Sequence, residues 1–86
     1  MKNLSPIFKA LSDDTRLTIL ALVFRHGPLC VCEVEKILGI TQSKASRHLR
    51  YLKAAGILED EAQGVMRVYR VRTDTLDRLR RYTDAL

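Results

Sequence analysis

Apolar residues recur every three or four positions in the first half of the chain, which is the spacing of helices. They predict a first helix over residues 4–11 and a second helix that Ser12 or Asp13 caps. The motif His26-Gly27-Pro28 is expected to end this second helix. Because its sequence is apolar around most of its circumference, we expect protein to surround it almost completely. A short third helix is predicted over residues 31–38.

The second half of the chain changes from helical spacing to alternation. Thr41 suits the N-cap of a longer helix over residues 42–55, and Gly56 suits its end. Two short stretches then read as strands, and in the second Val65, Arg67 and Tyr69 fall on one side and Met66, Val68 and Arg70 on the other. The strands are expected over residues 57–61 and 65–72 with a turn at Gln63-Gly64, and a last helix over residues 74–86.

The order of these elements predicts a winged helix-turn-helix. The short helix at residues 31–38 is joined through Gly39 to the longer helix, as in a helix-turn-helix unit. The hairpin directly after it has the position of a wing. We therefore expect a mainly α fold with a small β-hairpin, in one DNA-binding domain over residues 1–86. Similar scaffolds occur without DNA function, so a helical adaptor that binds no DNA is the alternative from another class.

The polar face of the long helix lies opposite its apolar stripe. An advance of about 100° per residue places Ala45, Leu49 and Leu52 together on one side. The opposite side carries hydroxyls, which allow close approach to a groove, and arginines, which reach phosphates or guanine edges. The amino-terminal end of such a helix enters the groove first. The predicted DNA contacts on this helix are Gln42, Ser43, Lys44, Ser46, Arg47 and Arg50.

Three further residues are assigned separately from this face. Lys53 is expected to hold the DNA backbone. Arg67, near the hairpin turn, is counted among the predicted DNA contacts because it could reach the minor groove or phosphates. An ordinary strand charge is the other interpretation of Arg67. His48 lies beside the apolar stripe, so we expect it to pack in the protein rather than read bases.

Charge and composition narrow the function. The net charge is +5, and residues 41–58 contain no acid although they contain four Lys or Arg. This distribution favours a polyanion as partner. The sequence shows no nucleophile–base pair, no phosphate-binding glycine loop and no complete metal triad, so an enzyme is not expected. We find neither a run of ~20 apolar residues nor a signal-peptide core, and expect a cytoplasmic protein with no membrane association.

The long helix and its surroundings resemble a known family. Residues 41–57, TQSKASRHLRYLKAAGI, are similar to the recognition-helix signature S-Q-x-x-V-S-R-H-L-x-x-L-x-x-A-G-L of ArsR/SmtB-type repressors. Residues 12–17, SDDTRL, resemble the opening motif of that family, and Gly64 with Val68-Tyr69-Arg70 resembles its wing. The resemblance implies a homodimeric winged-helix repressor that leaves its operator when an inducer binds.

Cys30 and Cys32 are the only cysteines. A disulfide between them would close a very tight ring, so we expect no such bond. Close cysteines in a cytosolic chain more often indicate metal or redox chemistry, and soft thiolates select thiophilic ions. Two buried cysteines acting as small hydrophobes are the other interpretation. His26 could be an extra ligand, but we expect it to stabilise the end of its helix.

The residues around the two cysteines also resemble a family motif. Residues 29–34, LCVCEV, resemble the L-C-V-C-D-L box of arsenic and antimony sensors in the family, and cadmium/lead sensors carry a similar box. The resemblance implies Cys30 and Cys32 as ligands of an As(III) or Sb(III) inducer, with cadmium, lead or oxidants as alternatives. Glu35 stands where arsenic sensors often carry a third cysteine. The last helix has no histidine, so the zinc-type site of the family is not expected.

The spacing of the two cysteines suggests how an inducer would act. Residues two apart on a helix point about 200° from each other. If both sulfurs hold one ion, the first turn of this helix is expected to unwind and to move the long helix through Gly39. Dimer contacts are expected from the apolar stripes of the first and last helices, which are Leu4, Ile7, Phe8, Leu76, Leu79 and Leu86.

Overall fold

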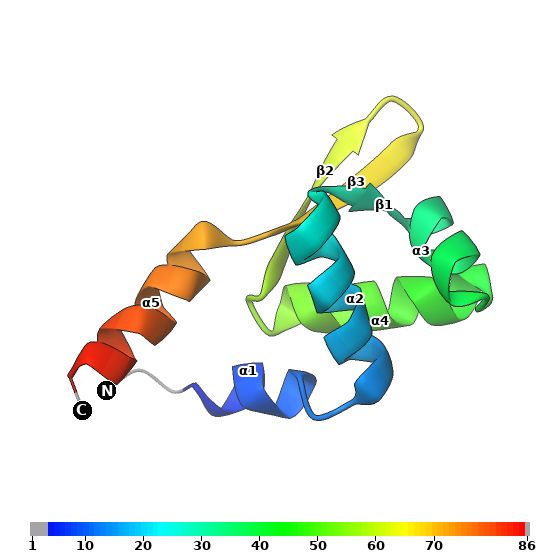
Figure 1. Cartoon of the computed structure of the whole chain (residues 1–86). Coiled ribbons are helices and arrows are strands. Elements are labelled where there is room, and N and C mark those ends of the chain that lie inside the picture. The colour runs from blue at the N-terminus through cyan, green and yellow to red at the C-terminus, as the bar shows by residue number, and fades with distance from the viewer. Residues whose placement is uncertain (1–3, 86) are drawn as a thin grey trace.

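The computed structural model describes residues 4–85, and Leu86 of the predicted dimer stripe lies outside them. The elements follow the expected order, with one short strand added (Figure 1). They are α1 (Ser5–Ala10), α2 (Asp14–His26), β1 (Leu29–Cys30), α3 (Val31–Leu38), α4 (Gln42–Ala54), β2 (Leu58–Gln63), β3 (Met66–Val71) and α5 (Thr73–Asp84). The mainly α winged helix-turn-helix predicted from the sequence is therefore confirmed.

Capping residues fix where the helices begin and end. The Asp13 carboxylate accepts a hydrogen bond from the Arg16 amide, so Asp13 rather than Ser12 caps α2. Thr41 caps α4 as expected, by accepting a hydrogen bond from the Lys44 amide. Between α3 and α4, Gly39 has a φ of 65°, in the left-handed region that side chains disfavour. This glycine lets the short helix turn directly into the long one.

The sheet contains three antiparallel strands in the order β1-β3-β2. The sequence did not predict β1, in which Leu29 pairs with Tyr69 and Cys30 with Val68. Strands β2 and β3 form the wing, which projects from the helices (Figure 1). Because β3 is the middle strand, its neighbouring residues Val68 and Tyr69 are both buried. The first strand ties the start of α3 to the wing.

The core lies where α2, α3, α4 and the base of the sheet meet. Its largest fully buried side chains are Ile19, Val34, Leu49, Leu52 and Leu58. Helix α2 contributes Ile19 and Val23 to it, but Leu17 and Phe24 on the same helix are 49% and 61% exposed. The expectation that α2 is almost surrounded is therefore wrong for the single chain, because nothing in it covers that side.

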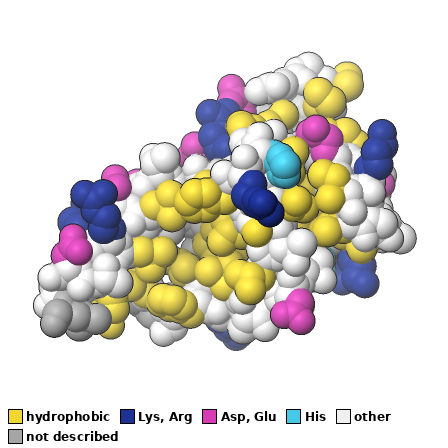
Figure 2. Space-filling view, in the orientation of Figure 1, with side chains coloured by type: hydrophobic (Ala, Val, Ile, Leu, Met, Phe, Trp, Pro, Cys, Tyr) yellow, Lys and Arg dark blue, Asp and Glu magenta, His cyan; other side chains and the backbone are white. Residues whose placement is uncertain are grey.

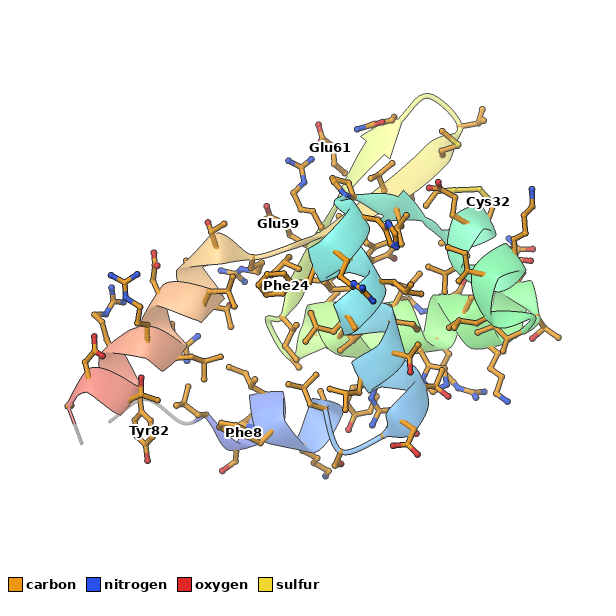
Figure 3. All side chains as sticks on the ribbon, in the orientation of Figure 1. Phe8, Phe24, Cys32, Glu59, Glu61 and Tyr82 are labelled. Atoms are coloured by element: carbon orange, nitrogen blue, oxygen red, sulfur yellow. A yellow bond between two sulfur atoms is a disulfide. The ribbon has the colours of Figure 1, made fainter. Side chains whose placement is uncertain are left out.

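Exposed apolar side chains gather between α1, α2 and α5, which extend toward the same end of the molecule (Figures 1 and 2). Phe24 projects from α2 toward α5, and Phe8 lies on α1 (Figure 3). Ile7 departs from the predicted dimer stripe, because it is only 3% exposed and belongs to the core of its own chain. We call the exposed set the apolar face; it comprises Phe8, Leu17, Phe24 and Leu76.

Candidate nucleic-acid interface and cysteine pair

Helix α4 separates a buried stripe from an exposed polar face. Ala45, Leu49 and Leu52 are fully buried, as the sequence predicted. The predicted DNA contacts on this helix all lie outside the core: Ser46 is half-buried, and the exposed ones are Gln42, Ser43, Lys44, Arg47 and Arg50. We call these six residues the polar face of α4. Their exposure leaves them free to contact a ligand, and their role toward DNA stays a prediction.

His48 is buried beside the stripe, at 7% exposure, as expected. Its Nδ1 lies 3.9 Å from Oδ2 of Asp13 and has no hydrogen-bond partner. Burial lowers the pKa of His48, and the nearby Asp13 carboxylate only partly opposes this. The backbone hydrogen bond from Arg16 lowers the pKa of Asp13. His48 therefore serves packing in its neutral form, and its ring is not presented to a ligand.

Arg16 joins three helices, a role that the sequence analysis did not identify. Its Nε donates to the carbonyl of Ala10 at 2.6 Å, at the end of α1. Its guanidinium carbon lies 3.9 Å from the ring centroid of Tyr51 on α4. These contacts hold the start of α2 against the α4 surface opposite the wing. An exposed aromatic such as Tyr51 is a possible partner for a cation. The sequence does not show that Arg16 is that cation, because the two residues are 35 positions apart.

The wing carries an ion-pair cluster that the sequence analysis also missed. Asp60 on β2 contacts Lys53 Nζ of α4 through one carboxylate oxygen and Arg67 Nη1 of β3 through the other, each at 2.9 Å. Farther along, Arg70 pairs with Glu61. The predicted DNA contact Arg67 and the bordering Lys53 are thus both bonded to protein in this structure. Their role toward DNA stays a prediction.

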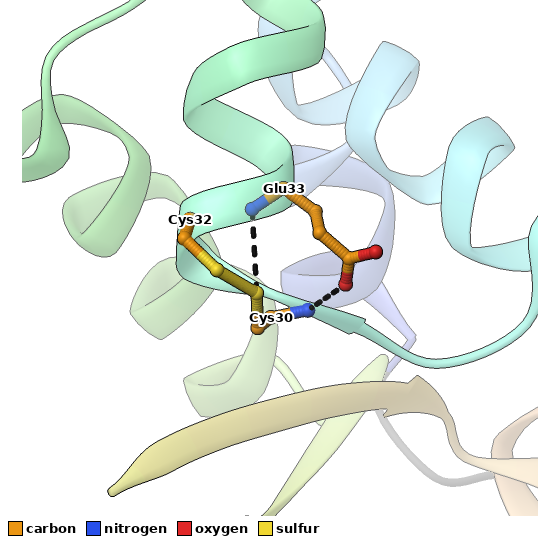
Figure 4. The surroundings of a disulfide bond; sticks show 3 residues. All are labelled: Cys30, Cys32 and Glu33. Carbon is orange, nitrogen blue, oxygen red and sulfur yellow. Dashed lines mark hydrogen bonds between the residues drawn. A yellow bond between two sulfur atoms is a disulfide. The ribbon is translucent and has the colours of Figure 1, made fainter.

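Cys30 and Cys32 form a disulfide, contrary to the expectation of no such bond (Figure 4). Cys30 lies in β1 with an extended backbone (φ −85°, ψ 165°), and only Cys32 is inside α3. The 200° separation of helical neighbours therefore does not apply. The premise behind the expected unwinding of the first turn of α3 is therefore wrong, because Cys30 lies outside the helix; the effect of an ion held by both sulfurs stays a prediction.

The Cys30 sulfur is also the cap of α3. It accepts a hydrogen bond from the Glu33 amide at 3.3 Å, and the Glu33 carboxylate accepts one from the Cys30 amide at 2.9 Å (Figure 4). This is a capping box in which a sulfur replaces the usual hydroxyl. Cys30 is buried and Cys32 is exposed, so the pair lies at the surface with one open side.

The donor set near the pair is small. Within residues 4–85, no group of three or more His, Cys, Asp or Glu side chains is placed to hold a metal ion. His26, considered as an extra ligand, is the last residue of α2 and is exposed, which agrees with a place at the helix end. Two reduced thiols this close fit a thiophilic ion by their chemistry, but the described chain supplies no third ligand. In the same residues no helix is both long and apolar enough to cross a bilayer.

Comparison with known proteins gives consistent matches. The family model described as "Bacterial regulatory protein, arsR family" matches residues 13–60. The arsenic resistance transcriptional regulator ArsR1 of Pseudomonas putida is 48% identical over 65 residues, covering 76% of this chain and 51% of the relative. A cadmium resistance regulatory protein CadC homolog of Staphylococcus aureus is 42% identical over 67 residues, covering 78% and 55%. The chain thus spans about half the length of these relatives.

The fold comparison agrees. The homodimeric winged helix-turn-helix DNA-binding domain Mb0332 of Mycobacterium bovis, a possible ArsR-family regulator solved by NMR, superimposes with a TM-score of 0.80. It is 28% identical, and the match covers 95% of this chain and 75% of that one. The similarity includes the whole helix-turn-helix, the wing and the outer helices.

Proposed function

Because the chain belongs to the arsR family of bacterial regulatory proteins, we propose that it is a DNA-binding transcriptional repressor whose Cys30–Cys32 pair receives the inducing signal. The polar face of α4 contacts operator DNA, and binding at the two sulfurs releases the protein. Arsenite or antimonite is the proposed inducer. The family membership argues against an enzyme, and the absence of acid from residues 41–58 argues against a general protein adaptor.

The observation that carries the DNA proposal is the composition of the one exposed side of α4. The exposed residues between positions 42 and 50 are all cationic or polar, while Ala45, Leu49 and Leu52 are fully buried. Arg47 and Arg50 are exposed and can reach phosphates or base edges in the major groove, and Ser43 allows the backbone to come close. Thr41 and the left-handed Gly39 hold this helix end in place. These features support binding to duplex DNA.

The apolar face supports a homodimer. Phe8, Phe24 and Leu76 expose 57%, 61% and 38% of their surface in a chain of 86 residues. Large side chains exposed together indicate a surface that another protein covers. The relative from Mycobacterium bovis is a homodimer by its description. If a second copy covers this face, the dimer carries two copies of α4. They can then bind two operator half-sites about 34–36 Å apart.

The cysteine pair has two connections to the DNA interface. Cys30 pairs with Val68 in the sheet, so it adjoins the central strand of the wing. Its sulfur also caps α3, which packs on α4. An ion bound to both thiolates competes with the Glu33 amide for the Cys30 sulfur, and this weakens the cap without unwinding the helix. Inducer and DNA then favour different arrangements of α3 and the wing, with a coupling of about 1–3 kcal/mol, or ~5–150-fold in affinity.

An oxidant is the second candidate inducer, and the disulfide favours it. Oxidation of the two thiols releases two protons and passes two electrons to an oxidant such as a peroxide, leaving the bond seen here. Cadmium and lead are further candidates, since a relative is described as a cadmium resistance regulator. The three inducer classes share the same two residues and differ only in what occupies the sulfurs.

Operator release distinguishes these inducers. A duplex is first enriched from a random library with the reduced wild-type protein, and its affinity is then measured by fluorescence anisotropy at fixed salt. We expect arsenite to weaken binding ~5–150-fold for wild type, and to have no effect on Cys30→Ser or Cys32→Ser. Cadmium and hydrogen peroxide are tested in parallel. If both variants respond to all three reagents like wild type, the cysteine pair is not the sensor.

A further inference from the structure

Asp60 holds the recognition helix and the wing together through separate atoms. Oδ1 binds Nζ of Lys53, in the last turn of α4, at 2.9 Å. Oδ2 binds Nη1 of Arg67, on the central strand β3, at 2.9 Å. The two contacts therefore do not compete, and one carboxylate joins three elements: α4, β2 and β3.

The exposure of the three side chains is unequal. The Asp60 side chain is 9% exposed, whereas those of Lys53 and Arg67 are 50% and 52% exposed. The hydrogen bond from Lys53, followed by that from Arg67, lowers the pKa of Asp60 against the opposing effect of burial. The carboxylate is therefore charged at neutral pH. Ion pairs with exposed cations add little to stability, so these contacts matter more for position and for charge than for folding.

Lys53 lies in the last turn of α4 and Arg67 lies on the wing, so a phosphate bound near either element would attract them. The carboxylate between them supplies the anion that DNA would otherwise supply. We propose that Asp60 is a positioning residue that fixes the wing relative to α4. It also keeps Lys53 and Arg67 bonded to protein instead of phosphate; this proposal rests on the proposed DNA-binding function. The wing then meets DNA with its fixed shape, while the contacts that carry charge come from Lys44, Arg47 and Arg50.

The proposal predicts a specific pattern of salt dependence. Each phosphate contact steepens the slope of log affinity against log salt by about 0.9 on duplex DNA. Asp60→Asn keeps the shape of the side chain but removes its charge and one acceptor oxygen, which weakens the hold on both cations. The slope on a random 30-base-pair duplex is expected to steepen by about 0.9 for each cation that reaches a phosphate. The preference for an enriched duplex over the random one is expected to fall.

Glu59→Gln is the matched control. Glu59, labelled in Figure 3, is the adjacent acid on β2. Neighbouring residues of a strand point to opposite sides of the sheet. Glu59 makes no ion pair within the described part of the chain. This variant changes the net charge as Asp60→Asn does but leaves Lys53 and Arg67 bonded. We expect its slope to stay much closer to that of wild type.

Two arginine variants test the assignment even if Asp60→Asn does not fold. Arg67→Gln in the wild-type background is expected to leave the slope unchanged, because Asp60 already occupies Arg67. Arg50→Gln is expected to reduce it by about 0.9. If Arg67→Gln reduces the slope as much as Arg50→Gln, Arg67 contacts phosphate and the proposal for Asp60 is overturned. If wild type shows no salt-dependent binding to any duplex, the proposed DNA function fails instead.

Discussion

Thr75 connects the start of α5 to the end of α4, and its hydroxyl is the most informative single group to remove. Thr75 is 3% exposed, and its Oγ1 donates a short hydrogen bond to the carbonyl of Gly56. Gly56 directly follows the last turn of α4. The contact therefore links a helix of the apolar face to the helix proposed to bind DNA. Thr75→Val keeps nearly the same shape but leaves the Gly56 carbonyl without this donor.

The cost follows from burial. Because the Thr75 side chain is buried, loss of its hydrogen bond to the Gly56 carbonyl is expected to cost about 1–3 kcal/mol. A domain of this length is stable by about 4–13 kcal/mol, at 0.05–0.15 kcal/mol per residue. The loss is therefore a sizeable fraction, and it corresponds to a fall in melting temperature of about 4–24 °C at 4–8 °C per kcal/mol. Thr75→Ser retains the hydroxyl and loses one methyl, so its cost is expected to stay near ~0.8 kcal/mol.

Urea unfolding, followed by circular dichroism at one protein concentration, measures these values. The concentration is held fixed because a dimer is more stable at higher concentration. We expect the midpoint to order wild type, Thr75→Ser, Thr75→Val. Equal unfolding of wild type and Thr75→Val would refute the reasoning, and so would a Thr75→Ser variant as unstable as Thr75→Val.

Two further predictions concern buried His48 and the N-cap residue Thr41 of α4. Burial lowers the pKa of His48, so below about pH 6.5 the unfolded chain binds a proton that the folded chain does not. The free energy of unfolding should therefore fall as pH drops from 6.5 toward the lowered pKa. His48→Gln should remove that dependence in urea titrations at pH 7.5 and 5.5. Thr41→Ala removes the N-cap of α4 and should cost about 0.5–2 kcal/mol, whereas Thr41→Ser should cost far less; equal losses in thermal melts of both variants would show that the hydroxyl does not cap.

The sequence allowed the helices, their caps and the polar face of α4 to be predicted, because all of these depend on residues close together in the chain. Periodicity alone placed Ala45, Leu49 and Leu52 in the core and Arg47 outside it. The hairpin was also predicted, although its turn is Gly64-Val65 rather than Gln63-Gly64, since Gln63 pairs with Met66.

The errors came from contacts between distant residues and from treating Cys30 as part of the helix that was predicted over residues 31–38. Strand β1 is two residues long, and it exists only because the wing strand lies beside it. That strand keeps Cys30 outside α3, which reversed the geometric argument about the two sulfurs. The Asp60 cluster joins residues 53, 60 and 67, which no local spacing relates. The exposed side of α2 was missed because its apolar sequence matches a buried helix as well as a dimer surface.

The central claim is that the polar face of α4 binds duplex DNA. Titration of the ¹⁵N-labelled reduced protein with the enriched duplex, followed by two-dimensional NMR, tests it at each residue. We expect the largest amide shift changes on residues 42–50 and on the wing, and little change on α1 and the apolar side of α5. Changes concentrated on α1 and α5, with residues 42–50 unaffected, would contradict it.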